Sequence, residues 1–214
     1  MATTDQRETR DRLLDEAERL FGERGIAEVS LREITSAADA NIASVNYHFG
    51  SKDGLVRELF ARRMGPLNDE RLRSLDEVQA AAGNSPPSLD AILRAFAGPT
   101  LRTARRYPDF MMLAARYHLE TRAHCTEILH SPGFHDLIGR IRELLILNFP
   151  DAPESALWLA MHFFVGMMLH TWTGAGAMEE LSGGIARWED DERMIDRLVD
   201  FGAAGFRALV EAES

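Results

Sequence analysis

The chain has 214 residues, of which 45% are hydrophobic and 27% charged, so it can bury one or two sizeable cores and does not resemble a disordered chain. Its single cysteine excludes an intramolecular disulfide framework, and its net charge of −10 disfavours a nonspecific DNA binder. The charged N-terminus lacks the pattern of a signal peptide, and the most apolar stretch, residues 156–172, is short for a membrane span. We therefore expect a cytoplasmic protein.

The acidic charge is unevenly distributed. Residues 1–63 hold 10 Arg and Lys against 12 Asp and Glu, whereas residues 64–214 hold 14 against 22. Residues 40–52 contain no acidic side chain, and this window ends at Lys52, the only lysine of the chain. Any contact with DNA must therefore be a local patch on an acidic body.

Helical periodicity dominates the N-terminal part of the chain. An apolar face at Leu13, Leu14, Ala17, Leu20 and Phe21 predicts a first helix over about 7–24, and Gly25 is placed to end it. The Ser30 and Glu33 pair has the spacing of a capping box and predicts the start of a second helix.

A turn over residues 39–41 separates this second helix from a third, predicted over about 42–48. Asn41 is placed to cap the third helix, and Ile42, Val45 and Phe49 have the spacing of an inward face. Ser51 is expected to cap a fourth helix that runs to about residue 63, before Gly65 and Pro66.

Further helices are predicted at about 67–83, 88–105, 108–130, 134–148, 153–175 and 190–211, separated by prolines and glycines. No convincing alternating strand pattern occurs. The expected fold class is all-α, with about nine helices. We expect one domain over residues 1–63 and a second over 64–214.

The second and third helices, joined by a three-residue turn, predict a helix-turn-helix motif over about residues 30–49. The second helix of such a motif lies in the major groove of DNA. Arg32, Ser44 and Asn46 are candidates for base contacts, and Tyr47, His48 and Lys52 are candidates for phosphate contacts. Ser30 and Ala43 complete the predicted DNA-binding set.

Three segments of this region together resemble the tetracycline-repressor (TetR/AcrR) family of bacterial transcription regulators: 20–25 (LFGERG), 30–34 (SLREI) and 47–52 (YHFGSK). Many members have Gly-Val in the turn where this chain has Asp39-Ala40, and Asp tolerates left-handed backbone better than most residues. The resemblance implies an all-helical C-terminal domain that dimerises and encloses an inducer.

By this resemblance, the dimer interface maps to helices at about 153–175 and 190–211. Phe201, Gly202, Gly205 and Phe206 are then expected to let the last helix pack closely on its mate.

Parts of residues 105–180 also resemble fatty-acid-responsive members of the family, which implies a small apolar effector, with a long-chain acyl compound as a candidate. The predicted ligand contacts are Met112, Arg116, Tyr117, His118, Trp158, His162 and Phe163. The alternative for most of these residues is a helical core and a dimer interface. The alternative for the function is a regulator controlled by a protein partner without a small ligand.

The sequence disfavours an enzyme. His124 and Cys125 are adjacent and point about 100° apart on a helix, so they cannot form a nucleophile–base pair. We expect no metal and no cofactor, because the histidines lack metal-ligand spacing and no glycine-rich phosphate loop occurs. The sequence therefore predicts a dimeric DNA-binding transcriptional regulator, in the role of a repressor released from a palindromic operator by its effector.

Overall fold

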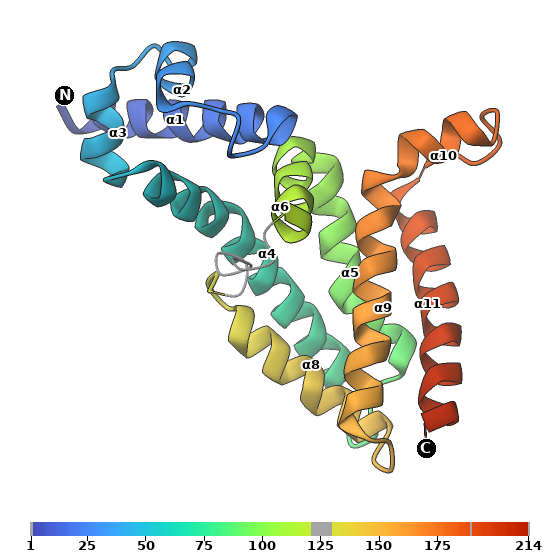
Figure 1. Cartoon of the computed structure of the whole chain (residues 1–214). Coiled ribbons are helices and arrows are strands. Elements are labelled where there is room, and N and C mark those ends of the chain that lie inside the picture. The colour runs from blue at the N-terminus through green and yellow to red at the C-terminus, as the bar shows by residue number, and fades with distance from the viewer. Residues whose placement is uncertain (1, 121–129, 189, 214) are drawn as a thin grey trace. The chain divides into compact units, whose positions relative to one another are not determined.

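The protein is described by a computed structural model in which residues 2–120, 130–188 and 190–213 are placed, and these residues form ten helices and no strand (Figure 1). This confirms the all-α fold class. The chain divides into two compact units, one over Met1–Pro66 and Tyr107–Phe134 and the other over Leu67–Arg106 and His135–Ser214. The boundary predicted after residue 63 stays a prediction.

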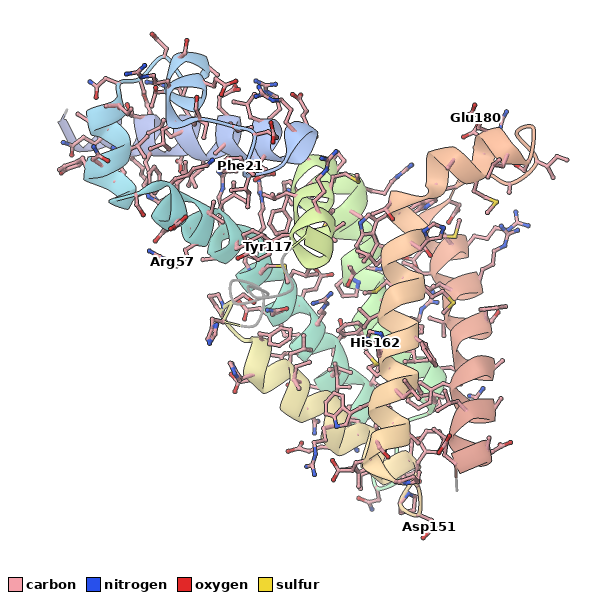
Figure 2. The ribbon with its side chains drawn as sticks, viewed as in Figure 1. Phe21, Arg57, Tyr117, Asp151, His162 and Glu180 are labelled. Atoms are coloured by element: carbon pink, nitrogen blue, oxygen red, sulfur yellow. The ribbon has the colours of Figure 1, made fainter. Side chains whose placement is uncertain are left out.

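The first unit is built on α1 (Ala2–Arg24), α2 (Leu31–Ala37), α3 (Ile42–Phe49), the first part of α4 (Lys52–Ala82) and α6 (Pro108–Glu120). The apolar face predicted for α1 is buried, and Phe21 lies in the core of this unit (Figure 2). Gly25 ends α1 with a φ of 86° and donates its N–H to the Phe21 carbonyl at 2.8 Å, as expected for this position.

Helix α6 packs tightly against α1. A Cβ atom on Gly22 would lie 2.5 Å from the carbonyl oxygen of Asp109, so only glycine permits this approach. A half-buried ion pair joins α1 to α4, because the Nε of Arg63 donates to Glu18 at 2.8 Å. The guanidinium of Arg63 also lies 3.8 Å from the centre of the Tyr107 ring.

The predicted end of the fourth helix near residue 63 is wrong. Helix α4 runs from Lys52 to Ala82 and contains Pro66 in its interior. Proline removes one backbone donor from a helix, but it does not end a helix whose flanking turns are held by packing. Here Met64 and Leu67, on either side of Gly65-Pro66, are both buried.

The second unit contains the rest of α4, α5 (Leu89–Arg106), α8 (Phe134–Asn148), α9 (Glu154–Thr173), α10 (Ala175–Leu181) and α11 (Asp191–Glu213). Helix α11 packs on both α5 and α9. The core draws apolar side chains from α4, α5, α8, α9 and α11, among them Leu75, Leu93, Ile141, Phe164 and Phe206. The short helix α10, which buries no side chain, was missed by the helix prediction.

Two residues of the predicted dimer face, Gly202 and Phe206, also make contacts inside this unit. A Cβ atom on Gly202 would lie 2.5 Å from the Phe164 ring, and the Phe206 ring stacks on Phe149 with centres 5.8 Å apart. Phe201 and Gly205, beside them on α11, are exposed. The four residues line one apolar hollow, so the predicted dimer face of α11 stays a prediction.

No helix among the described residues is long and apolar enough to span a membrane.

Candidate nucleic-acid interface

The start of α2 is held by the predicted capping box. The hydroxyl oxygen of Ser30 accepts the N–H of Glu33 at 3.3 Å, and the Glu33 carboxylate accepts the N–H of Ser30 at 2.8 Å. Arg24 donates to the same carboxylate at 2.8 Å. These bonds, those from Ser30 first, lower the pKa of Glu33 to about 2. The hydroxyl of Ser30 is thereby engaged in the cap, since it donates to Glu33 at 2.7 Å.

The turn between α2 and α3 has left-handed backbone at Asp39, whose φ is 48°. Asp is one of the few residues that adopt this conformation at modest cost. Asp39 can therefore occupy the turn position at which many similar proteins have glycine. Arg12, from α1, donates its Nε–H to the Ala38 carbonyl at 3.1 Å and so ties the turn to α1. As predicted, Asn41 caps α3, because its side-chain oxygen accepts the N–H of Ser44 at 2.9 Å.

Helix α3 presents a polar, uncovered face. Ala43, Asn46 and Tyr47 are exposed at i, i+3 and i+4, and the Tyr47 side chain is 72% exposed. Ser44 is half-buried and donates its hydroxyl to Asn41 at 3.2 Å. His48 is also half-buried, with its ring 4.9 Å from the Tyr47 ring in an edge-on contact.

The prediction that Ile42 belongs to the inward face of α3 is wrong. Val45 and Phe49 are buried as expected, but Ile42 is 45% exposed. Helical spacing fixes the direction of a side chain, yet it does not tell whether a neighbouring helix extends far enough to cover the first turn. Ile42 therefore adds an apolar side chain to the exposed part of α3 that the sequence prediction missed.

Arg32 is the one arginine within the helix-turn-helix motif, residues 30–49. Its exposed side chain makes no hydrogen bond or ion pair with any residue that the structure describes. In contrast, Arg24 pairs with Glu33, and Arg10 with Glu58. The guanidinium of Arg32 thus keeps its five N–H donors for a partner outside the chain.

Lys52 begins α4, next to the predicted cap. Ser51 accepts the N–H of Gly54 at 3.0 Å, which confirms the cap. Gly54 is required there, because a Cβ atom on it would lie 1.9 Å from the Phe49 carbonyl oxygen. The half-buried Lys52 donates to the Ile26 carbonyl at 2.5 Å, and its Nζ lies 5.7 Å from the centre of the Phe21 ring. Lys52 therefore ties α4 to the end of α1, a role that the sequence prediction missed.

The residues predicted to bind an effector fall into both units. Met112, Arg116 and Tyr117 lie on α6 in the first unit, where the Tyr117 ring contacts Phe60 with centres 5.0 Å apart. Trp158, His162 and Phe163 are exposed residues of α9 in the second unit. Figure 2 shows His162 on this helix. The side chain of His118, together with His124 and Cys125, lies outside the described residues. An effector site formed by this set stays a prediction.

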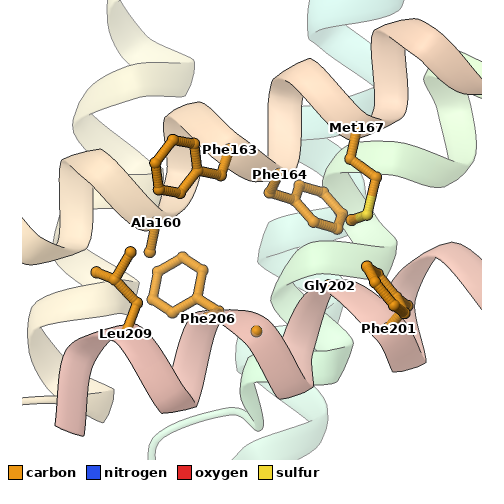
Figure 3. A pocket seen from close by; sticks show the side chains of 9 residues that line it. Ala160, Phe163, Phe164, Met167, Phe201, Gly202, Phe206 and Leu209 are labelled. Atoms are coloured by element: carbon orange, nitrogen blue, oxygen red, sulfur yellow. The ribbon is translucent and has the colours of Figure 1, made fainter. Parts of the chain in front are cut away.

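A shallow hollow of about 130 Å³ lies between the outer parts of α9 and α11 (Figure 3). Its lining is apolar: Ala160, Phe163, Phe164, Met167, Phe201, Gly202, Gly205, Phe206 and Leu209. Phe163 and Phe201 are 57% and 74% exposed, so these two helices present large apolar side chains on the surface of the second unit.

An all-helical chain with a capped helix-turn-helix near its N-terminus defines the class of helical, DNA-binding transcription regulators. Residues 13–59 match the family of bacterial regulatory proteins named tetR, and residues 94–205 match the tetracyclin repressor-like C-terminal domain. The second match alone covers more than half of the chain, so this protein belongs to the TetR family. Members of the family bind DNA operators and act as dimers.

Relatives of known sequence support the same family. Over 51 residues the chain is 39% identical to the probable HTH-type transcriptional regulator YttP of Bacillus subtilis, a match that covers 24% of this chain and 25% of YttP. Over 83 residues it is 34% identical to the HTH-type transcriptional regulator AcrR of Shigella flexneri, which covers 38% of this chain and 36% of AcrR. The matches thus span about a quarter to a third of these relatives.

The fold is similar to that of HlyIIR, a hemolysin II transcriptional regulator. The two share 20% sequence identity over 92% of this chain and 97% of HlyIIR, with a TM-score of 0.62. At this identity the likeness concerns the fold.

Proposed function

We propose that this TetR-family regulator is a repressor that binds a pseudo-palindromic operator as a homodimer and is released from it by a small apolar effector. The observation that carries the DNA-binding part is the uncovered side chain of Arg32 beside the exposed face of α3. A cation that makes no ion pair with any described residue, next to a helix of small and polar side chains, suits the major groove.

The contacts divide by chemistry. Arg32 has the reach for a bidentate contact with O6 and N7 of guanine, and Asn46 for a contact with a base edge. Ile42 and Ala43 can pack on thymine methyl groups, and the Ser44 hydroxyl retains lone pairs for a donor. Tyr47, His48 and Lys52 bind phosphates. Ser30, at the start of α2, contributes a further contact to the DNA backbone.

Lys52 can serve both the fold and the DNA. Its ammonium has three N–H donors, and one of them is used on the Ile26 carbonyl. The remaining donors are available to a phosphate at the capped start of α4, where backbone N–H groups also favour an anion.

The dimer forms through the outer faces of α9 and α11. Exposed Phe163 and Phe201 flank the apolar hollow, and exposed Gly205 leaves open space beside it. In a two-fold interface each copy presents the same surface to the other, so a bulky ring of one copy can enter the hollow of its mate. Burial of these rings supplies the association energy.

Two recognition helices related by the dimer axis read half-sites about 34–36 Å apart. Control by an effector requires that it binds one separation of these helices more tightly than the other. An acyl compound is the candidate effector of this proposal. Extraction of the purified protein followed by mass spectrometry tests it directly.

The DNA-binding proposal is tested by selection of binding sites from a random duplex library. We expect a two-fold symmetric consensus for the wild type. Arg32→Ala should retain binding but lose the preference for guanine at one position of each half-site, with discrimination reduced by about 1–3 kcal/mol. Arg73→Ala, an exposed arginine on α4 in the second unit, is the matched control and should keep the consensus. An identical consensus for Arg32→Ala would remove Arg32 from the base-reading set.

A protein partner in place of a small effector is the second candidate. It is favoured by exposed apolar side chains on and after α10, where Met178, Leu181 and Ile185 are largely uncovered. The double variant Leu181→Ser, Ile185→Ser distinguishes a protein partner from a small effector. Loss of operator release in cells, with unchanged release by an extracted effector in vitro, would favour the protein partner.

A further inference from the structure

Arg71 is a buried arginine of the second unit that forms no ion pair with a carboxylate of the described residues. It lies on α4, and only 6% of its surface is exposed. Its Nε and Nη2 donate to the hydroxyl oxygen of Thr100 at 3.1 and 2.6 Å, and its Nη1 donates to the side-chain oxygen of Asn68 at 3.1 Å. All three contacts are to neutral groups, and none of the described carboxylates forms an ion pair with this guanidinium.

The exposed arginines of the same unit behave in the opposite way. Arg94 and Arg102 both pair with Glu192, and Arg207 pairs with Asp90. A surface ion pair contributes little, whereas an uncompensated charge in the interior is costly. The carboxylates of this unit thus pair with exposed arginines, for which an ion pair contributes little, whereas the buried Arg71 has only neutral partners among the described residues.

The neutral partners hold the guanidinium in a fixed orientation. Thr100, itself buried, donates its hydroxyl to the Phe96 carbonyl at 3.0 Å, so its oxygen faces Arg71 as an acceptor. The guanidinium lies 4.4 Å from the centre of the Phe96 ring. Asn68, the third contact, is fully buried. A guanidinium has five N–H groups, and these hydrogen bonds use three of them.

We propose that Arg71, held by Thr100 and Asn68, binds the carboxylate of the effector, which makes the effector an apolar monocarboxylic acid. A guanidinium matches the planar geometry of a carboxylate with two parallel N–H donors. The Phe96 ring beside it belongs to the apolar core of this unit, so the surroundings of the guanidinium are apolar. This inference deepens the proposed control by a small ligand and rests on it.

The electrostatics of the site agree with this assignment. Burial lowers the pKa of Arg71 to about 9, and the charge of neighbouring Glu70 opposes this shift only in part. Glu70 is moreover paired with Arg102 at 3.5 Å. Arg71 is still charged at neutral pH, and a bound carboxylate offsets its desolvation.

The test compares acids with neutral analogues of the same shape. Octanoate, benzoate and phenylacetate, each beside the corresponding primary alcohol, are titrated into the full-length protein by calorimetry. We expect at least one acid to bind at least about tenfold more tightly than its alcohol, because a charge-assisted, bidentate pair is lost in the alcohol. Arg71→Met should remove this preference and leave the affinity for the alcohol unchanged.

Two further variants keep the test decisive if Arg71→Met does not fold. Arg71→Lys keeps the positive charge but lacks the two parallel N–H donors of a guanidinium. It should bind the acid with an affinity between those of the wild type and Arg71→Met. Arg102→Met removes an exposed, paired arginine of the same unit and should bind it like the wild type. Failure of all three acids to bind the wild type, or equal loss of acid and alcohol in the Arg71 variants, would overturn the inference.

Operator binding, measured in parallel on the effector-free protein, separates this inference from the proposed function. Release of the operator by an alcohol but by no acid would leave ligand control standing and remove Arg71 from it. Loss of sequence-specific binding in the wild type would instead contradict the proposed function.

Discussion

Lys52 combines two roles that can be measured separately. Its hydrogen bond to the Ile26 carbonyl is made by a charged donor, which contributes about 1.5–3 kcal/mol when formed inside a protein. Its contact with the Phe21 ring adds about 0.5–1 kcal/mol. Because the side chain is only half-buried, we expect Lys52→Met to lower the free energy of unfolding by about 2 kcal/mol. Urea denaturation measures this loss.

The DNA contact has a different signature. Each phosphate neutralised by a protein cation contributes about 0.9 to the slope of log K against log salt concentration. Lys52→Met should therefore reduce that slope by about 0.9 for each protomer on the operator, at temperatures where the variant stays folded. Binding to unrelated duplexes should weaken in the same proportion, because a phosphate contact carries no sequence information.

Two control variants assign the effects. Lys52→Arg keeps the charge and should retain most of the slope, while its bulkier head strains the bond to Ile26. Arg73→Met changes the net charge equally but lies in the second unit, and it should alter neither quantity. If Lys52→Met lowers stability but leaves the slope of log K against log salt concentration unchanged, Lys52 stabilises the fold only and does not contact phosphate. If it changes the slope without loss of stability, the bond to Ile26 contributes nothing measurable.

Three further predictions follow from the caps, the turn and the dimer. The pKa of Glu33 is lower in the folded chain than in the unfolded one, so its contribution to stability is present above about pH 4.5 and lost towards pH 2. Glu33→Gln should flatten the dependence of the free energy of unfolding on pH in that window. The control variant Glu77→Gln, at an exposed position of α4, should leave that dependence as it is in the wild type. Acid titration followed by circular dichroism measures both. Asp39→Gly should raise the free energy of unfolding by up to about 1 kcal/mol, because glycine adopts a φ of 48° without strain. An equal gain in Asp39→Ala, whose Cβ disfavours this φ, would disprove the explanation. Phe201→Glu should raise the dissociation constant of the dimer by at least about tenfold in sedimentation experiments, and an unchanged constant would place the interface elsewhere.

The sequence predicted local structure well wherever a signal was chemical and short-range. The capping box at Ser30, the cap at Asn41 and the glycine end of α1 are all confirmed. Each depends on one side chain or one φ angle within a few residues, so the sequence contains all the information needed. The all-α class followed from the same periodicity.

The errors concern which neighbours cover a side chain. Ile42 has the spacing of a core residue and is 45% exposed. Helical spacing alone does not show whether a neighbouring helix covers a side chain. The internal bond of Lys52 joins residues 26 apart, and nothing local in the sequence indicates it.

The way this chain uses its arginines limits how it can bind DNA. Most arginines of the first 66 residues are paired with carboxylates: Arg10, Arg19, Arg24, Arg62 and Arg63. These pairs stabilise helices but leave few cations for phosphates, and the remainder of the chain is strongly acidic. We therefore expect a shallow salt dependence and weak binding to random sequences. Affinity for the operator must then come mainly from base contacts by Arg32 and α3, so that specificity depends on a small number of side chains rather than on charge.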